Sequence, residues 1–179
     1  FEVAVWNRTA KACDPLLAQG AKLLNLEAIS DYPIVLICLS DDDAVQSVFD
    51  FIKPNLTAKQ VIVDFSSLSV DKTKSLAEES KSKNVIWIDS PVSGGTAGAE
   101  NGSLVIFAGG DANVIESLSN IYAVLSQRVT RMGDTGTGQA TKICNQLIVA
   151  ANSTLIAEAV ALAGQAGVDT RLLAPALAD

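Results

Sequence analysis

Three short, mostly apolar runs, each followed by small or acidic residues, constrain the fold of this chain more than any other feature. They span residues 34–39, 61–65 and 84–89. Runs of this length are typical of strands that are buried on both faces of a parallel sheet. Two further runs, at residues 2–6 and 104–108, indicate additional strands.

Helical patterns alternate with these runs, at residues 10–19, 41–52, 70–82 and 111–125. Strands that alternate with helices, without repeats or low-complexity linkers, predict a doubly wound α/β domain. Ligands of such sheets bind beyond the carboxyl ends of the strands. That rule selects four polar turns, Asn7-Arg8-Thr9, Leu39-Ser40-Asp41, Ser66-Ser67 and residues 90–95. Each turn taken alone is also consistent with an ordinary strand-to-helix connection.

A long helical pattern extends from Gln139 to about residue 166, with Gly164 as its one glycine and no proline. Apolar residues recur in it at steps of three and four, which is helical periodicity. Lys142, Asn145 and Gln146 are one helical turn apart, so their side chains share a face. Such a polar cluster meets either solvent or a substrate.

Charge and composition exclude several classes of function. The net charge of −7 disfavours nucleic acid and anionic membranes as the main partner, while a locally positive pocket for a small anion stays possible. The chain contains no histidine, so any proton transfer must use Lys, Tyr, Cys, Asp or Glu. No uninterrupted apolar run reaches the roughly 18 residues of a membrane-spanning helix, and polar residues interrupt the long helix. We therefore expect no membrane span.

The three cysteines are Cys13, Cys38 and Cys144. They are far apart, odd in number and without the spacing of a metal site. We therefore expect buried free thiols in a reducing compartment, the cytoplasm, and no bound metal.

Arg8 follows what would be the second strand of a dinucleotide-binding, Rossmann-type sheet. The residue at this point lies beside the adenosine ribose, where an acid suits the 2′-hydroxyl of NAD and an arginine accommodates the 2′-phosphate of NADP. The glycine-rich fingerprint of that fold lies about 20 residues upstream. We therefore expect the first strand and its glycine-rich loop to precede residue 1. An exposed turn arginine without a ligand is the alternative interpretation.

Paired glycines mark the turn between Ser93 and Ala99. Gly94 and Gly95 let the backbone approach a ligand closely. Consecutive N–H groups beside the Ser93 hydroxyl could bind a carboxylate. A flexible glycine turn is the alternative.

Three separated motifs resemble the β-hydroxyacid dehydrogenase family, which includes 3-hydroxyisobutyrate dehydrogenase, tartronate semialdehyde reductase and the glyoxylate/succinic semialdehyde reductases. Residues 89–104 resemble its substrate-binding signature, and residues 136–145 resemble its catalytic helix. Residues 5–9 resemble the end of the second strand in NADP-preferring members. The match covers essentially the whole chain, with the motifs in the family's order.

The resemblance implies a role for each matching residue. Lys142 would be the general acid that protonates the carbonyl oxygen during reduction, and the base in the reverse direction. The substrate would be held at its carboxylate by Ser93, Gly94 and Gly95, and oriented by Asn145. The cofactor would be bound by Asn7, Arg8 and Thr9 at its 2′-phosphate, and by Leu39, Ser40 and Ser67 along its groove.

Two positions depart from the family pattern. Many members have Asn-Asn after the lysine, where this chain has Asn145-Gln146, a pair associated with the tartronate semialdehyde reductase branch. Gln146 can therefore take the substrate contact. Ser67 stands where many members have threonine.

The resemblance also implies two domains. Residues 1–135 would form the dinucleotide-binding domain, and residues 136–179 would form the interdomain helix and the start of a helical C-terminal domain that is mostly absent from the chain. In the family, homodimers or homotetramers form through the long helix and the C-terminal domain.

The function implied by the resemblance is an oxidoreductase that uses NADP, with NAD as the alternative cofactor. It would reduce a small carboxylated aldehyde, such as tartronate semialdehyde, glyoxylate or succinic semialdehyde, to the hydroxyacid. A 3-hydroxyisobutyrate dehydrogenase that works oxidatively is one alternative. A non-catalytic dehydrogenase-like binding or assembly module is another alternative. Loss of the lysine would mark such a module, and Lys142 is present. An imine reductase ranks lower, because those enzymes typically replace this lysine.

Overall fold

A computed structural model describes residues 1–178 of the chain. Contacts divide the chain into two units, residues 1–141 and the part from Lys142 onward. The first unit contains all eight of the strands that the described residues form.

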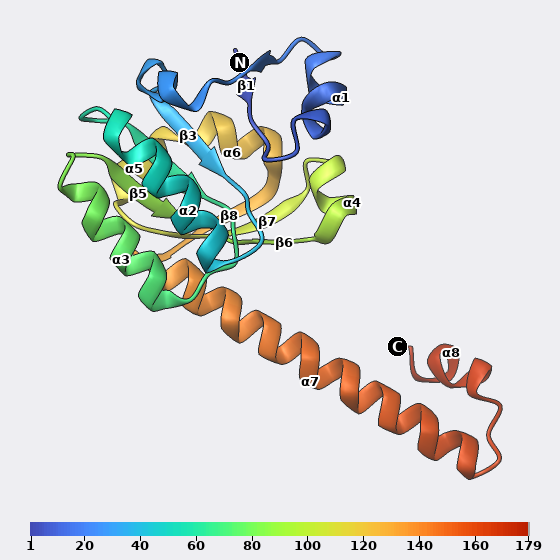
Figure 1. The fold of residues 1–179 in the computed structure, drawn as a ribbon. Coiled ribbons are helices and arrows are strands. Elements are labelled where there is room, and N and C mark those ends of the chain that lie inside the picture. Colours follow the sequence, from blue (N-terminus) through green and yellow to red (C-terminus); the bar gives the residue numbers. More distant parts are fainter. Residues whose placement is uncertain (179) are drawn as a thin grey trace. The chain divides into compact units, whose positions relative to one another are not determined.

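The elements are labelled in Figure 1. The strands are β1 (Ala4–Val5), β2 (Lys22–Leu23), β3 (Ile34–Ile37), β4 (Val61–Asp64), β5 (Ile86–Asp89), β6 (Val92–Ser93), β7 (Leu104–Gly109) and β8 (Ser126–Gly133). The α-helices are α1 (Asp14–Leu17), α2 (Asp42–Ile52), α3 (Val70–Lys81), α4 (Gly95–Glu100), α5 (Ala112–Ser117), α6 (Ser119–Leu125), α7 (Thr137–Gln165) and α8 (Leu173–Leu177). Short 3-10 helices are η1 (Ala10–Cys13), η2 (Leu26–Asp31), η3 (Lys53–Asn55) and η4 (Thr170–Leu172).

The main sheet confirms the predicted doubly wound α/β fold. Strands β3, β4 and β5 are parallel neighbours, and Ile37, Asp64 and Asp89 lie side by side at their last paired positions. The carboxyl ends of these strands therefore meet at one edge of the sheet. Strand β7 is antiparallel to β5 and β6 and parallel to β8, whereas β1 and β2 form a separate parallel pair.

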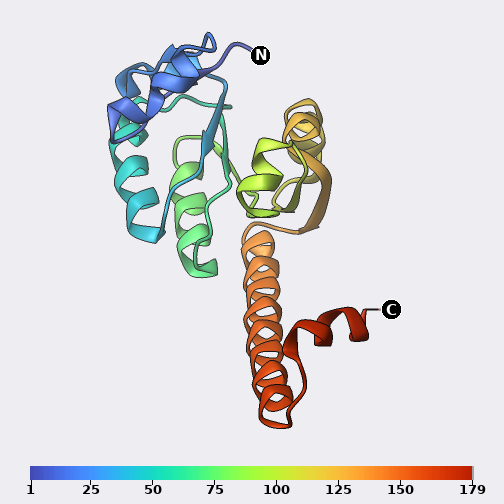
Figure 2. The ribbon, with the colours of Figure 1, turned by 90° about the vertical axis from the view of Figure 1, so that its right-hand side faces the viewer.

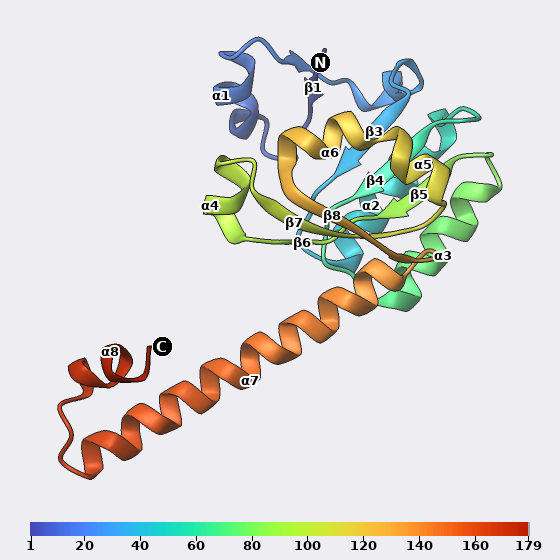
Figure 3. The same ribbon diagram turned by 180° about the vertical axis from the view of Figure 1, so that it is seen from behind.

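Buried side chains cover both faces of the sheet, as its apolar strands predict. Successive residues of a strand point to opposite faces, so Ile62 and Trp87 pack in one core while Val63 and Ile88 pack in the other. Helices α2 and α3 cover the first face, and α5 and α6 cover the second (Figures 1 and 3). Both cores lie in the first unit.

Two predicted helices are interrupted. The pattern at residues 10–19 forms η1 and then α1, because Pro15 lies in the first turn of α1 and its ring fits a helix start but not a helix interior. The pattern at residues 111–125 divides at Leu118, whose φ of −87° and ψ of 1° close α5. The predicted cap at Asp111 is confirmed, since its carboxylate accepts hydrogen bonds from Asn113 N and Val114 N.

Three strands were not predicted, β2, β6 and β8. Strand β6 has only two residues and lies in the predicted turn at residues 90–95. Strand β2 has only two residues, which is too short for a sequence pattern. Strand β8 carries Gln127, Arg128 and Arg131 on exposed positions and pairs with β7 alone among the described strands. Such an edge strand lacks the continuous apolar run by which the inner strands are found.

Helix α7 begins two residues before its predicted start and runs unbroken to Gln165 (Figure 2). By length and composition it could cross a membrane, since an 18-residue window has a mean hydropathy of 1.7 and none of it is buried. The expectation that its polar residues exclude a span by composition is therefore wrong. This result concerns length and composition alone.

The predicted burial of the cysteines holds for only one of them. Cys13 is buried, whereas Cys38 and Cys144 are exposed, and all three are free thiols. Cys38 follows the last paired residue of β3 and Cys144 lies on α7, so an apolar neighbourhood in sequence did not imply burial.

Candidate functional site

Three of the four predicted turns leave the sheet at the same edge. Leu39-Ser40 follows β3, Ser66-Ser67 follows β4, and the segment from Ser90 follows β5, the three adjacent parallel strands. Leu39 N donates to Ser66 Oγ at 2.9 Å, which joins the first two turns directly. The rule that ligands bind beyond strand ends thus selects turns that lie side by side.

The Arg8 turn follows β1, in the separate pair of strands. Within the turn, Thr9 N donates to Asn7 Oδ1 at 2.8 Å, and all three predicted residues are exposed. The pKa of Asp41 is lowered mainly by the hydrogen bond from Ala44 N and by Ser40, and further by the positive charge of Arg8. Arg8 therefore lies within electrostatic range of the turn that follows β3.

Ser67 is exposed between two buried neighbours, Ser66 and Leu68. The buried Gln139 holds the backbone on both sides of it. Gln139 Nε2 donates to Ser66 O at 2.8 Å, and Leu68 N donates to Gln139 Oε1 at 3.1 Å. The turn is thus fixed in shape while the Ser67 side chain remains open to solvent.

The Ser93–Gly95 segment is a strand-to-helix junction rather than a loose glycine turn. Ser93 ends β6 opposite Val105 of β7, and α4 begins at Gly95. Gly94 and Gly95 have φ values of +127° and +61°, which explains why glycine stands at both positions. Both glycines are exposed and Ser93 is half-buried, so a ligand could reach this backbone.

Lys142, Asn145 and Gln146 lie on α7 in the second unit and are described separately from the turns. Lys142 is half-buried, and burial lowers the pKa of its amine. The Asn145 Oδ1 atom is buried and accepts no hydrogen bond from any residue between 1 and 178. Gln146 is exposed. An amine with a lowered pKa beside an unused acceptor is suited to proton transfer and polar recognition.

The start of α7 is held by the fully buried Asp89, the last residue of β5. Gly136 N donates to Asp89 Oδ1 at 2.7 Å, and Gln139 N donates to Asp89 Oδ2 at 3.0 Å. Burial raises the pKa of this carboxyl, and the backbone hydrogen bonds oppose that rise. Gly138 has no room for a side chain, because an added Cβ would overlap the Phe107 carbonyl oxygen.

Two protein-family profiles match the chain. Residues 1–133 match the NAD binding domain of 6-phosphogluconate dehydrogenase, and residues 136–179 match the NAD-binding domain of NADP-dependent 3-hydroxyisobutyrate dehydrogenase. The chain belongs to the β-hydroxyacid dehydrogenase family. It is therefore an NAD(P)-binding member of an enzyme family of oxidoreductases, as its sequence motifs predicted.

Named relatives agree with this family. The 2-hydroxy-3-oxopropionate reductase of Escherichia coli is 35% identical over 162 residues, covering 87% of this chain and 55% of that protein. The mitochondrial 3-hydroxyisobutyrate dehydrogenase of Drosophila melanogaster is 32% identical over 175 residues, covering 95% of this chain and 53% of that protein. The chain thus spans about half the length of these curated relatives.

A solved structure shares the fold. The 3-hydroxyisobutyrate dehydrogenase of Mycobacterium tuberculosis, determined with L-serine, superposes with a TM-score of 0.86 at 25% identity. The match covers 90% of this chain and 56% of that one.

The residues of this chain suit an NAD(P) cofactor. Arg8 forms no ion pair or hydrogen bond with the rest of residues 1–178, so its guanidinium is available to an anion. The exposed hydroxyl of Ser67 and the exposed Ser40 lie on adjacent turns of the same edge. A cation and hydroxyls of this kind match the phosphate and ribose groups of a dinucleotide.

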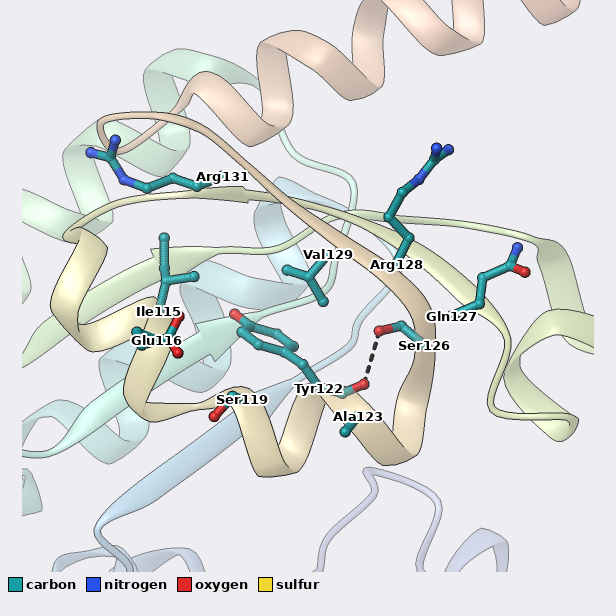
Figure 4. A pocket seen from close by; sticks show the side chains of 10 residues that line it. All are labelled: Ile115, Glu116, Ser119, Tyr122, Ala123, Ser126, Gln127, Arg128, Val129 and Arg131. Carbon is teal, nitrogen blue, oxygen red and sulfur yellow. Dashed lines mark hydrogen bonds between the residues drawn. The ribbon is translucent and has the colours of Figure 1, made fainter.

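A cavity of about 500 Å³ lies elsewhere, between α5, α6 and β8 (Figure 4). It is lined by residues such as Tyr122, Arg128 and Arg131, and by none of the predicted site residues. Arg131 already donates to Gly110 O and pairs with Asp134. Figure 4 shows that Arg128 and Arg131 point in different directions, so they do not form a common anion site.

Two structurally important residues were missed in the sequence, Asp89 and Gln139. Both are completely buried and hydrogen-bonded. Asp89 could have been found, because it is an acid at the end of an apolar strand and the first residue of the substrate-binding signature. Gln139 gave no signal, because its partners lie about 70 residues away along the chain.

Proposed function

We propose that the protein of which this chain is part is an NADPH-dependent reductase of small carboxylated aldehydes. Tartronate semialdehyde, glyoxylate and succinic semialdehyde are the candidate substrates. Lys142 carries the proposal, since its half-buried amine has a lowered pKa on the helix that matches the family's catalytic motif. The similarity to a 2-hydroxy-3-oxopropionate reductase supports this substrate class.

In the proposed reaction, Lys142 Nζ donates a proton to the carbonyl oxygen as the aldehyde becomes an alcohol. A bound reduced nicotinamide supplies the hydride to the carbonyl carbon. A lowered pKa helps the lysine to release that proton near neutral pH. Asn145, with its unused Oδ1, and Gln146 would orient the substrate.

The substrate carboxylate would bind at Ser93, Gly94 and Gly95, where positive φ values hold the backbone in an exposed junction. The assignment rests on the family motifs and on the chemistry of each group.

We propose NADP rather than NAD as the preferred cofactor, because Arg8 is an exposed cation where NAD enzymes carry an acid. Arg8→Asp removes the phosphate partner and adds an acceptor for a ribose hydroxyl. The ratio of kcat/KM for NADPH to that for NADH should fall by about a hundredfold. An unchanged ratio would remove Arg8 from the cofactor site.

The proposal includes a cytoplasmic homodimer or homotetramer. Three free cysteines, two of them exposed, support a reducing compartment. Light scattering of the purified protein measures the assembly directly.

A substrate panel tests the function. NADPH oxidation is measured with tartronate semialdehyde, glyoxylate and succinic semialdehyde, and NADP⁺ reduction is measured with 3-hydroxyisobutyrate. A cyclic imine serves as the control for imine reduction. The proposal is supported if one of the three aldehydes has a higher kcat/KM than 3-hydroxyisobutyrate and the imine. Preference for 3-hydroxyisobutyrate or the imine would overturn it in favour of those activities.

A further inference from the structure

Gln139 is a fully buried polar residue with no assigned role, and its amide spans two elements. It lies in the first turn of α7, and its partners lie in the turn between β4 and α3. Its Oε1 accepts from Leu68 N at 3.1 Å, and its Nε2 donates to Ser66 O at 2.8 Å. The two bonds lie on either side of Ser67, the exposed residue that the family motif places in the cofactor groove.

The same turn is connected to the other strand ends. Ser66 Oγ accepts from Leu39 N at 2.9 Å, and Ser66 N donates to Asp64 Oδ1 at 2.9 Å. The backbone of Gln139 is itself fixed, because Gln139 N donates to Asp89 Oδ2 at 3.0 Å. These bonds form one buried network that joins the ends of β3, β4 and β5 to the start of α7.

We propose that Gln139 is a positioning residue for the cofactor: it holds the turn that presents Ser67 in its binding conformation. This role rests on the proposed function, because it requires the Ser67 turn to contact the dinucleotide. A pre-shaped turn binds its ligand without the entropic cost of ordering the loop, and that cost appears as weaker affinity when the shape is lost.

Gln139→Met tests the role, because methionine has a similar length and removes both hydrogen bonds. The matched control is Gln60→Met. Gln60 is also buried, and its amide also joins separate segments, accepting from Thr57 N and donating to Ile29 O and Tyr32 O. It precedes β4, at the opposite end of that strand from the Ser67 turn. The two variants thus remove comparable bonds at opposite ends of one strand.

Two quantities are measured on the full protein, the Kd for NADP⁺ by calorimetry and the steady-state KM for NADPH with kcat. Gln139→Met should raise both the Kd and the KM by about tenfold or more, with a smaller change in kcat. Gln60→Met should lower the thermal midpoint but change the Kd and the KM by less than about twofold. Equal effects of the two variants, or a Kd unaffected by Gln139→Met, would overturn the proposal.

Gln139→Glu provides a second test if the methionine variant does not fold. A protonated glutamic acid can accept from Leu68 N with one oxygen and donate to Ser66 O with the other. Ionised glutamate has no proton to donate and repels that carbonyl oxygen. The ratio of the variant's Kd to the wild-type Kd, measured at each pH, should therefore approach one as the pH falls from 8 to 5. This range of about three units spans the raised pKa of a buried carboxyl. A ratio that does not change with pH would contradict the role.

The calorimetry separates this proposal from the proposed function. A wild-type protein that binds NADP⁺ but reduces none of the aldehydes would refute the reductase, while the Gln139 comparison still decides the role in binding. A wild-type protein that does not bind NADP⁺ would refute both.

Discussion

Two buried carboxylates at the ends of neighbouring strands differ in how their charges are compensated. Asp89 uses both oxygens to hold the start of α7. Asp64 accepts from Ser66 N with Oδ1, whereas its buried Oδ2 has no hydrogen-bond partner among residues 1–178. Burial raises the pKa of Asp64 to about 6, the hydrogen bonds from Ser66 partly oppose the rise, and the charge of Asp89 adds to it. Asp64 is therefore the buried acid whose ionisation is least compensated.

Asp64 gives stability a defined pH dependence. Its pKa is higher in the folded chain than in the unfolded chain, so the folded state binds the proton more tightly. The resulting stabilisation is present below about pH 4 and is lost as pH rises through about 6. Asp64→Asn removes this loss. The free energy of unfolding of the variant, minus that of the wild type, should rise by up to about 3 kcal/mol between pH 4 and pH 8.

Urea unfolding at several pH values measures that difference. A difference that stays constant from pH 4 to pH 8 would show that Asp64 titrates alike in both states. The comparison between variant and wild type cancels the contribution of the acids that do not interact with Asp64. Asp89 interacts with Asp64, so its own titration contributes to the difference.

At the scale of elements, buried contacts fix the start of α7, the helix that matches the family's catalytic motif. Glycine is required at positions 136 and 138, before and in the first turn of α7, for two different reasons. Gly136 has a φ of +92°, and Gly138 lies against the Phe107 carbonyl and the Asp89 carboxylate. Gly136 thus supplies the left-handed backbone before the helix, and Gly138 allows the helix to pack closely against β5 and β7.

Gly138→Ala should destabilise the protein by about 2 kcal/mol or more, since the added methyl overlaps backbone that cannot move freely. Gly164→Ala in the same helix is the control. Its added Cβ would meet only Thr170 Cγ2, at an ordinary 3.6 Å, so the better helix propensity of alanine should stabilise by up to about 1 kcal/mol. Chemical denaturation compares the two, and equal effects would refute the packing argument.

The sequence was informative where one local pattern determines an element. The inner strands β3, β4 and β5 were predicted because each is a continuous apolar run. The helices α2, α3 and α7 were predicted from helical sequence patterns with their period. Strand β8 was not predicted, since its exposed Arg128 and Arg131 carry no such period. The antiparallel direction of β7 was also missed, because strand direction depends on pairing and not on composition.

The candidate site also contains residues that the sequence predicts and contacts that only the structure shows. Motifs identified Lys142, Arg8 and Ser67 as candidates, because the family pattern has those residue types at fixed spacings. The supporting contacts of Gln139 could not be predicted, since they join residues that only the folded sheet brings together. The roles of the motif residues remain predictions, whereas the buried network on either side of Ser67 is a property of the structure.

At the scale of the whole molecule, the chain is an α/β unit followed by a second unit that α7 dominates. Apolar side chains of α7, such as Leu147, Leu155 and Leu162, are each at least 65% exposed. The curated relatives match both parts and are longer than this chain, which spans about half their length, so the activity proposed here belongs to the intact protein. The central proposal for the intact protein is that Lys142 supplies the proton for carbonyl reduction.

The most direct test is Lys142→Ala in the intact protein, with Lys81→Ala, which removes an exposed lysine of α3, as the control. NADPH oxidation with the best aldehyde should fall by about a thousandfold in the Lys142 variant, while its affinity for NADPH stays within about twofold of the wild type. Lys81→Ala should change neither quantity. Full turnover by Lys142→Ala, with NADPH bound normally, would contradict the account.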